Sequence, residues 1–312
     1  MTNPNSARRQ FLQTIVAAGA SCLAATAFAQ DKEGLQQPVF RIAARGENLV
    51  QQPGDHPLDR ALRIAADSLA HIRKNIDDYT CTMIKRERIN GVLNEYEYMK
   101  AKIRCRKVQD GQIVVPLGAY LHFIKPASVA GREVCYVETK NNGKLVAHEG
   151  GLLGKVSAML DPNSRLAMRN NLYPITEIGL ENLVVKLIEK GERDKQLDPA
   201  GKETQVEFKQ GAKINGRKCL VLTVKHTVQR PQYDFEVAQV FIDDEHNMPV
   251  RYIAYGWPQV PGDAQPILEE YTYVDVKVNQ GLKDIDFDHT NPAYKFGPIA
   301  LGGVKGEGRN GN

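Results

Sequence analysis

The clearest pattern of apolar and polar positions lies between Phe235 and Phe296, where three strand-like runs follow one another. Val, Ile, Tyr and Phe dominate each run, and Asp, Asn, Gly or Pro residues bound it, which is typical of antiparallel strands joined by turns. The runs are Phe235–Asp243, Val250–Trp257 and Ile267–Val278. Three such strands bury a face only when another layer covers it, so the rest of the chain must supply that layer.

Runs of similar composition recur through the earlier part of the chain. Two pairs of them flank Asn-Gly turns, at Asn142-Gly143 and Asn215-Gly216, and these pairs predict hairpins. The chain as a whole predicts about ten antiparallel strands. The earlier runs are Tyr79–Ile89, Tyr96–Val108, Ala119–Ile124, Arg132–Glu138, Lys144–His148, Thr204–Phe208 and Cys219–His226.

Two segments carry apolar residues at helical spacing instead. The first runs from Leu58 to Ile72, with Pro57 expected in its first turn, and the second is Leu180–Lys190, with Gly191 expected to end it. Strands and helices do not alternate as in a Rossmann fold. The prediction is an α+β domain in which a long, curved antiparallel sheet, a half-barrel of about ten strands, holds the helices in its concave face.

The connection between the first two strands is constrained by the positions of their apolar faces. Asn90-Gly91 would suit a two-residue hairpin turn. That turn would pair odd positions with even ones and place the apolar faces on opposite sides of the sheet, so an odd-length loop or a bulge is expected. With a loop centred near Leu93, Cys81 and Cys105 become direct partners on one face.

The N-terminus has the pattern of an export signal. Arg8-Arg9 precedes an apolar, Ala-rich stretch that ends in Ala27-Phe28-Ala29, a suitable cleavage site, and the arginine pair resembles the twin-arginine motif. The alternative is an uncleaved anchor, because the apolar stretch approaches the length of a membrane span. Residues 1–29 are therefore predicted as the signal of a protein exported to the periplasm or cell envelope, and no later segment is apolar enough to span a membrane.

Composition predicts the remaining boundaries. Residues 30–55 lack periodicity and are predicted to be a flexible linker, residues 297–312 are a Gly-rich, disordered tail, and residues 56–296 are the folded domain. The chain has 41 Lys and Arg against 37 Asp and Glu, and the difference falls to two charges once Arg8 and Arg9 are removed. Such a balance leaves no basic surface for nucleic acid, which is not expected as a partner.

Four of the five cysteines remain after removal of the signal, and an even number in an oxidising compartment allows disulfides. Cys81–Cys105 is the preferred pair and would stabilise the fold by roughly 3 kcal/mol. The alternative is that all four are small buried apolar side chains, namely Cys81, Cys105, Cys135 and Cys219. No CxxC sequence occurs, so no metal site is expected.

Short motifs are spread over Leu58–Phe296, namely Tyr79-Thr80-Cys81, Lys85-Arg86-Glu87-Arg88, Gly131 to Val137, Tyr173 to Gly179, Tyr255 to Pro258, Glu270 to Tyr273 and Asp286 to Tyr294. In these motifs the chain resembles the domain-of-unknown-function 1571 family of exported bacterial proteins. More remotely, the order of elements is similar to that of the LolA-like outer-membrane lipoprotein carrier and of the RseB-type sensor fold. The remote resemblance implies an apolar cavity between sheet and helices that holds acyl chains.

Side chains that could line such a cavity lie on the predicted strands and on the second helix, and flexible Met suits an adaptable pocket. Lys102 and Arg104 lie near the basic edge where a carrier would receive a polar headgroup or a lipoprotein's carbonyl group. The alternatives are a filled core and a solvated strand face. The cavity candidates are Met83, Met99, Ile103, Leu121, Phe123, Met159, Leu160, Val184 and Leu187.

No nucleophile elbow, zinc-protease motif or phosphate-binding loop occurs in the chain. The polar clusters suited to acid–base work are better explained as turns and strand ends, namely His148-Glu149, Asp243-Asp244-Glu245 and Asp286/Asp288/His289. We therefore predict a non-enzymatic envelope protein without a cofactor that binds a lipid or a lipoprotein acyl chain. The alternative is a sensor-type module that binds an envelope protein or peptide and has no lipid cavity.

Overall fold

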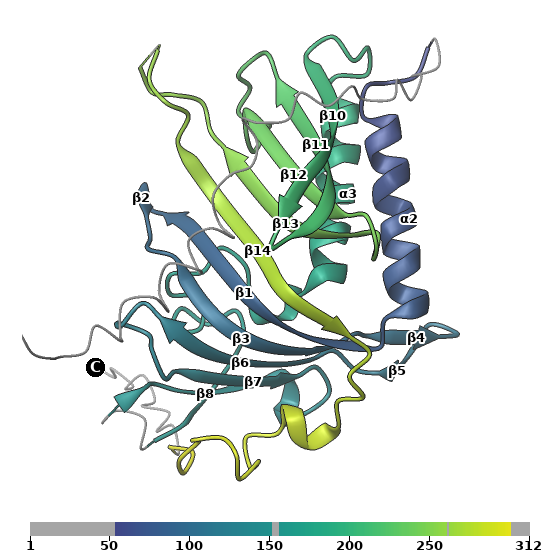
Figure 1. Ribbon diagram of the computed structural model, residues 1–312. Coiled ribbons are helices and arrows are strands. Elements are labelled where there is room, and N and C mark those ends of the chain that lie inside the picture. Colours follow the sequence, from purple (N-terminus) through teal and green to yellow (C-terminus); the bar gives the residue numbers. More distant parts are fainter. Residues whose placement is uncertain (1–53, 152–155, 261, 301–312) are drawn as a thin grey trace, which may run out of the picture. The chain divides into compact units, whose positions relative to one another are not determined.

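The computed structural model describes residues 54–151, 156–260 and 262–300 (Figure 1). The export signal, nearly all of the linker and most of the Gly-rich tail lie outside the described residues, so these assignments stay predictions. The described chain is an α+β domain with two long helices packed against one large antiparallel sheet, and the predicted fold class is confirmed.

Twelve strands form the large sheet, in the order β10-β11-β12-β13-β14-β1-β3-β6-β7-β8-β9, with the short β2 paired to β1. A separate hairpin, β4 (Lys107–Gln109) and β5 (Gln112–Val115), was not predicted. The strands of the large sheet are β1 (Asp78–Ile89), β2 (Val92–Leu93), β3 (Glu97–Arg104), β6 (Gly118–Lys125), β7 (Glu133–Val137), β8 (Leu145–His148), β9 (Ala158–Leu160), β10 (Thr204–Ile214), β11 (Arg217–His226), β12 (Val237–Asp243), β13 (Met248–Tyr255) and β14 (Ile267–Val278).

The two helices, α2 (Asp59–Asn75) and α3 (Leu180–Leu197), lie side by side over the part of the sheet that contains β10 to β14 (Figure 1). They run antiparallel, because an ion pair joins Lys195 near the end of α3 to Asp59 at the start of α2. At their other ends Arg73 and Glu181 are joined at 2.8 Å. The face of the sheet that they cover is called the helix-covered face below.

α3 continues for six residues beyond Gly191, so the expectation that this glycine ends the helix is wrong. The glycine has a packing role instead. A Cβ at this position would lie 2.9 Å from Leu62 Cδ2, so Gly191 lets the two helices approach closely. Pro57 also differs slightly from the prediction, since it precedes the first helical residue by two positions.

The predicted meander of three strands forms as β12, β13 and β14. β14 pairs with β1 along most of its length, for example Met83 with Tyr273. The last strand of the chain therefore lies beside the first, in the interior of the sheet, while β10 and β11 lie outside the meander.

The first connection uses both a tight turn and an extra residue. Asn90 and Gly91 have positive φ angles and join β1 to β2 in the two-residue register, in which Ile89 faces Val92. Beyond β2 the register shifts by one residue, so that Cys81 faces Ala101 in β3. The predicted bulge is thus present, and the apolar faces coincide.

The predicted loop centre near Leu93 is wrong, and so is the direct pairing of Cys81 with Cys105. Cys105 lies just beyond the end of β3, where its N–H donates to Asp77. Both cysteines are buried free thiols, as are Cys135 and Cys219. The structure therefore agrees with the alternative, in which the cysteines act as small apolar side chains.

The opposite face of the sheet is covered in part by the C-terminal segment. There η5 (Asp284–Phe287) packs Phe287 against Tyr120, Cys135 and Val137. On this face Tyr294 stacks on Tyr120, with ring centroids 3.8 Å apart. Successive residues of β3 therefore alternate between the main core and this second layer.

Candidate functional site

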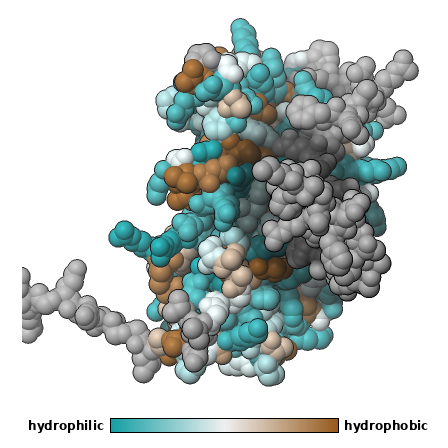
Figure 2. All heavy atoms as spheres, turned by 60° about the vertical axis from the view of Figure 1, so that its left-hand side comes forward, coloured by the Kyte–Doolittle hydropathy of each residue, from teal (hydrophilic) through white to brown (hydrophobic). Residues whose placement is uncertain are grey.

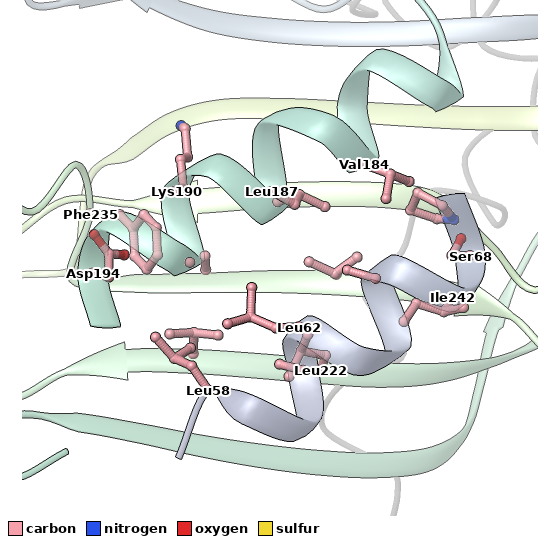
Figure 3. A pocket seen from close by; sticks show the side chains of 17 residues that line it. Leu58, Leu62, Ser68, Val184, Leu187, Lys190, Asp194, Leu222, Phe235 and Ile242 are labelled. Carbon is pink, nitrogen blue, oxygen red and sulfur yellow. The ribbon is translucent and has the colours of Figure 1, made fainter. Parts of the chain in front are cut away.

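An apolar cavity lies between α2, α3 and the strands β11, β12 and β13 (Figure 3). The space between these walls measures about 700 Å³, and part of this volume is open solvent. All but three of the 17 lining residues are apolar. They are Leu58, Ala61, Leu62, Ala65, Ser68, Val184, Leu187, Lys190, Gly191, Asp194, Leu222, Val224, Phe235, Ala238, Val240, Ile242 and Pro249.

The pattern of each element explains why these side chains meet. The lining positions recur three or four residues apart on both helices, so they form one stripe on each. On β12 they recur every second residue, which places Ala238, Val240 and Ile242 on the helix-covered face. Small residues leave the volume unfilled, because Ala61, Ala65, Ala238 and Gly191 stand where larger side chains would close the gap.

The three polar side chains in the wall already have partners. Ser68 donates its hydroxyl to the Asn247 carbonyl at 2.7 Å. Asp194 Oδ2 is 3.2 Å from His226 Nε2. In Figure 3 the Lys190 ammonium points away from the other lining side chains, and it donates to Glu269 at 3.1 Å.

Lys190 belongs to a buried polar cluster at the cavity wall. Glu269 accepts from Lys190, from the Tyr173 hydroxyl at 3.3 Å and from the Tyr252 hydroxyl at 3.2 Å. Burial alone would lower the pKa of Lys190, but Tyr252, Glu269, Tyr173 and Asp234 outweigh it and hold the pKa above its usual value. The lysine is therefore a fixed cation that ties α3 to the sheet.

Sequence reasoning missed this cluster, although Glu269 and Tyr271 alternate on one face of a predicted strand. Glu87 is the direct partner of Glu269 on β1, and it accepts from Tyr271 at 2.5 Å and from Lys85 at 2.9 Å. Charged residues inside two predicted strands, at positions in line with the apolar face, were the signal that could have revealed it.

Only two of the predicted cavity residues, Val184 and Leu187, line the main cavity. Ile103 borders a smaller hollow near the start of α3. The others lie away from this cavity: Met83, Met99, Leu121 and Phe123 belong to the main core on β1, β3 and β6, and Met159 and Leu160 lie on β9. The reason is geometric, because large side chains fill that part of the sheet while the small ones lie under the helix pair.

Lys102 and Arg104, the expected polar rim, face the side of the sheet opposite the cavity. Lys102 is 2.6 Å from Asp286, and Arg104 is 2.5 Å from Asp284. Both basic side chains thus hold the C-terminal segment against the sheet, and neither is placed to contact a ligand in the cavity.

Asp194, His226 and Thr204 superficially resemble a catalytic triad, with Thr204 Oγ1 3.5 Å from His226 Nδ1. All three are almost completely buried, and Tyr233 stacks on the imidazole at 3.9 Å between ring centroids. No substrate can reach the threonine hydroxyl in this arrangement, so the three residues fasten α3 to β10 and β11.

The polar clusters singled out in the sequence also have structural partners. Asp243 accepts from the backbone N–H groups of Glu245 and His246 at 2.9 Å, and His148 Nε2 is 3.0 Å from Glu133. Among the described residues, no group of three or more His, Cys, Asp or Glu side chains is arranged to hold a metal ion.

Solved structures with a similar arrangement are remote in sequence. A putative outer membrane lipoprotein-sorting protein domain from Vibrio parahaemolyticus is 14% identical, covers 73% of this chain and 95% of its own, and has a TM-score of 0.34. Pseudomonas aeruginosa MucB, in complex with MucA, is 15% identical with a TM-score of 0.39; the match covers 73% of this chain and 60% of that protein. A LolA superfamily protein from Nitrosomonas europaea is 10% identical, with 73% and 97% covered and a TM-score of 0.27.

Likeness at this level concerns chain architecture and not function. The search of curated proteins returned no match. Within the described residues, no helix has an apolar stretch long enough to cross a bilayer. The family model of DUF1571, a protein of unknown function, matches residues 76–296, and the chain therefore belongs to the DUF1571 family.

Proposed function

We propose that this protein binds the acyl chain of a lipid or lipoprotein in the cavity between α2, α3 and the sheet. The observation that carries the proposal is the lining of the cavity. Its walls are apolar except for Ser68, Lys190 and Asp194, and each of these already has a hydrogen-bond partner within the protein. A ligand inside therefore finds no free polar group and gains most by being apolar.

An acyl chain fits this chemistry better than a polar small molecule. Each methylene group removed from water contributes about 0.8 kcal/mol, so a chain of several carbons is held without any hydrogen bond. The headgroup stays at the solvent-open part of the cavity, since the walls offer it nothing. Export to the periplasm or cell envelope, which we infer from the N-terminal pattern, would bring the protein to such ligands.

Mass spectrometry of the protein purified without detergent tests the proposal. Extracts of the wild-type protein should contain lipid in near-stoichiometric amount. The Ala238→Leu variant should carry much less, because its larger side chain fills the cavity while burying more apolar surface.

Ala101→Leu is the matched control. Ala101 is equally buried on β3, but it lies outside the cavity lining. This variant should lose about 1–3 kcal/mol of stability through overpacking and yet keep its lipid. Lipid-free wild-type protein, or equal lipid in both variants, would contradict the proposal and favour the alternative of a protein-binding module.

A further inference from the structure

A short segment of turns, residues 161–173, lies between β9 and the 3-10 helix η4 (Ile175–Glu177). Its conformation is fixed by internal hydrogen bonds, such as Met168 N–H to the Ser164 carbonyl at 2.9 Å and the Asn171 side-chain amide to the Ala167 carbonyl at 3.0 Å. This segment, called the 161–173 segment below, presents its outward side chains in a defined arrangement.

Those outward side chains combine apolar surface with unpaired positive charge. Leu166 is 59% exposed and Leu172 is 38% exposed. Arg165 and Arg169 are also exposed, and neither side chain makes a hydrogen bond or an ion pair with any described residue. The single acidic side chain of the segment, Asp161, accepts from the Asn163 backbone at 2.8 Å.

Another exposed apolar site, the β4–β5 hairpin, lacks this combination. Figure 2 shows apolar groups scattered among polar ones on the side of the molecule in view. The β4–β5 hairpin exposes Val108, Ile113 and Val114, but its lysine, Lys107, is engaged with the carbonyls of Arg73 and Ile76.

We propose that the 161–173 segment docks the protein on the anionic surface of a phospholipid bilayer. Arginine guanidinium groups bind phosphate oxygens with two parallel hydrogen bonds, and two free arginines complement a layer of anionic headgroups. The leucines between and after them enter the headgroup boundary, where apolar side chains leave water. An apolar protein partner would satisfy the leucines alone and leave both arginines without partners.

Hydrogen bonds that anchor the 161–173 segment also connect this surface to the cavity wall. Asn171 Oδ1 accepts from Lys85 at 2.6 Å, and the Tyr173 hydroxyl bonds to Glu269, which also holds Lys190. Lys190 in turn lines the cavity. The docking surface itself does not depend on an acyl chain being bound, so the inference stands apart from the proposed function.

Co-sedimentation with vesicles tests the inference on the full chain after removal of any bound lipid. The protein should partition onto phosphatidylethanolamine vesicles that contain phosphatidylglycerol, and high salt should weaken this binding. Each arginine contributes about fivefold near an anionic surface, so Arg165→Gln with Arg169→Gln should lower the partition coefficient by about 25-fold. Leu166→Ser should lower the partition coefficient by about tenfold at both low and high salt, because the apolar contribution does not depend on charge.

Lys213→Gln with Lys218→Gln is the control, because it removes the same charge from exposed, unpaired side chains at the far end of the sheet. It should leave the partition nearly unchanged. Equal losses in both charge variants would overturn the inference, and so would equal binding to vesicles without phosphatidylglycerol. Thermal melts of each variant show that the fold is intact.

Discussion

Gly191 and Gly201 each lie close to a neighbouring side chain. A methyl group added at either position would contact that neighbour, but the two neighbours differ in their freedom to move. A Cβ on Gly191 would lie 2.9 Å from the end of the Leu62 side chain, which borders the cavity. A Cβ on Gly201 would lie 2.4 Å from the rigid ring of Pro57, and Gly201 also has a positive φ of 62°. The first neighbour has space to move into and the second does not.

Gly191→Ala should therefore raise the free energy of unfolding by up to about 1 kcal/mol, the gain in helix propensity, while Leu62 moves into the cavity. Less acyl chain should bind, since the cavity shrinks. Gly201→Ala should instead lower the free energy of unfolding by at least about 1 kcal/mol, because strain and clash add. Urea unfolding of both variants measures these changes. A marked fall in the free energy of unfolding for Gly191→Ala would show that the Leu62 side chain cannot move aside.

The four described cysteines should be inert in the folded protein. Burial raises the pKa of the Cys81, Cys105 and Cys219 thiols to about 12, and it raises that of Cys135 as well. Thiolate is the reactive form, so iodoacetamide at pH 8 should label these residues only after denaturation. Intact mass measured without reductant should show all four thiols free. A loss of two hydrogens would instead reveal a disulfide.

At the scale of elements, Asp243 organises the hairpin between β12 and β13. Its carboxylate pairs with Arg217 and accepts from two backbone N–H groups of the turn. Burial alone would raise its pKa, but Arg217 and the N–H groups of His246 and Glu245 outweigh burial, and the pKa lies below the usual 3.8. A carboxylate whose pKa is lower in the folded state adds stability above the unfolded-state pKa and loses it as the pH falls through the folded-state value.

Asp243→Asn should therefore cost about 2 kcal/mol at pH 7, through the loss of charge-assisted hydrogen bonds. The difference from wild type should shrink steadily below about pH 4. Asp244→Asn, on the same turn with an exposed side chain, should change stability by less than about 0.5 kcal/mol at either pH. A difference for Asp243→Asn that stays constant down to pH 2 would contradict this account.

Local pattern predicted most elements, because alternation and turn residues act over a few positions. It identified the meander, both Asn-Gly hairpins and the need for an extra residue after Asn90. It misplaced the cysteine register, since the Asn90-Gly91 turn does form and centres the pairing of β1 and β3 near Gly91, whereas the prediction replaced this turn with a wider loop centred near Leu93. The cavity was also misplaced, because its volume depends on small residues from two helices and a strand that meet only in the folded chain.

For the molecule as a whole, the sheet and the helix pair have different capacities to move. Every strand bordering the cavity is hydrogen bonded on both sides within the sheet, so this wall is continuous. The helix pair is joined by the contact of Leu62 with Gly191 and, at its two ends, by partly exposed ion pairs, which contribute little stability. Entry of an acyl chain is therefore expected to require separation of α2 from α3 or from the sheet.

A disulfide across the helix pair tests that expectation. The Cβ built on Gly191 lies 3.6 Å from Leu62 Cγ, the position that the sulfur of Leu62→Cys would take, so Leu62→Cys with Gly191→Cys brings the two side chains within reach of a disulfide. Oxidation should slow release of a pyrene-labelled fatty acid at least tenfold if the helices must separate to let the acyl chain leave, and reductant should restore it. Leu62→Cys alone is the control and should be insensitive to oxidation, since the native thiols are buried. Unchanged release from the oxidised double variant would place the exit elsewhere, between the helices and the strand ends.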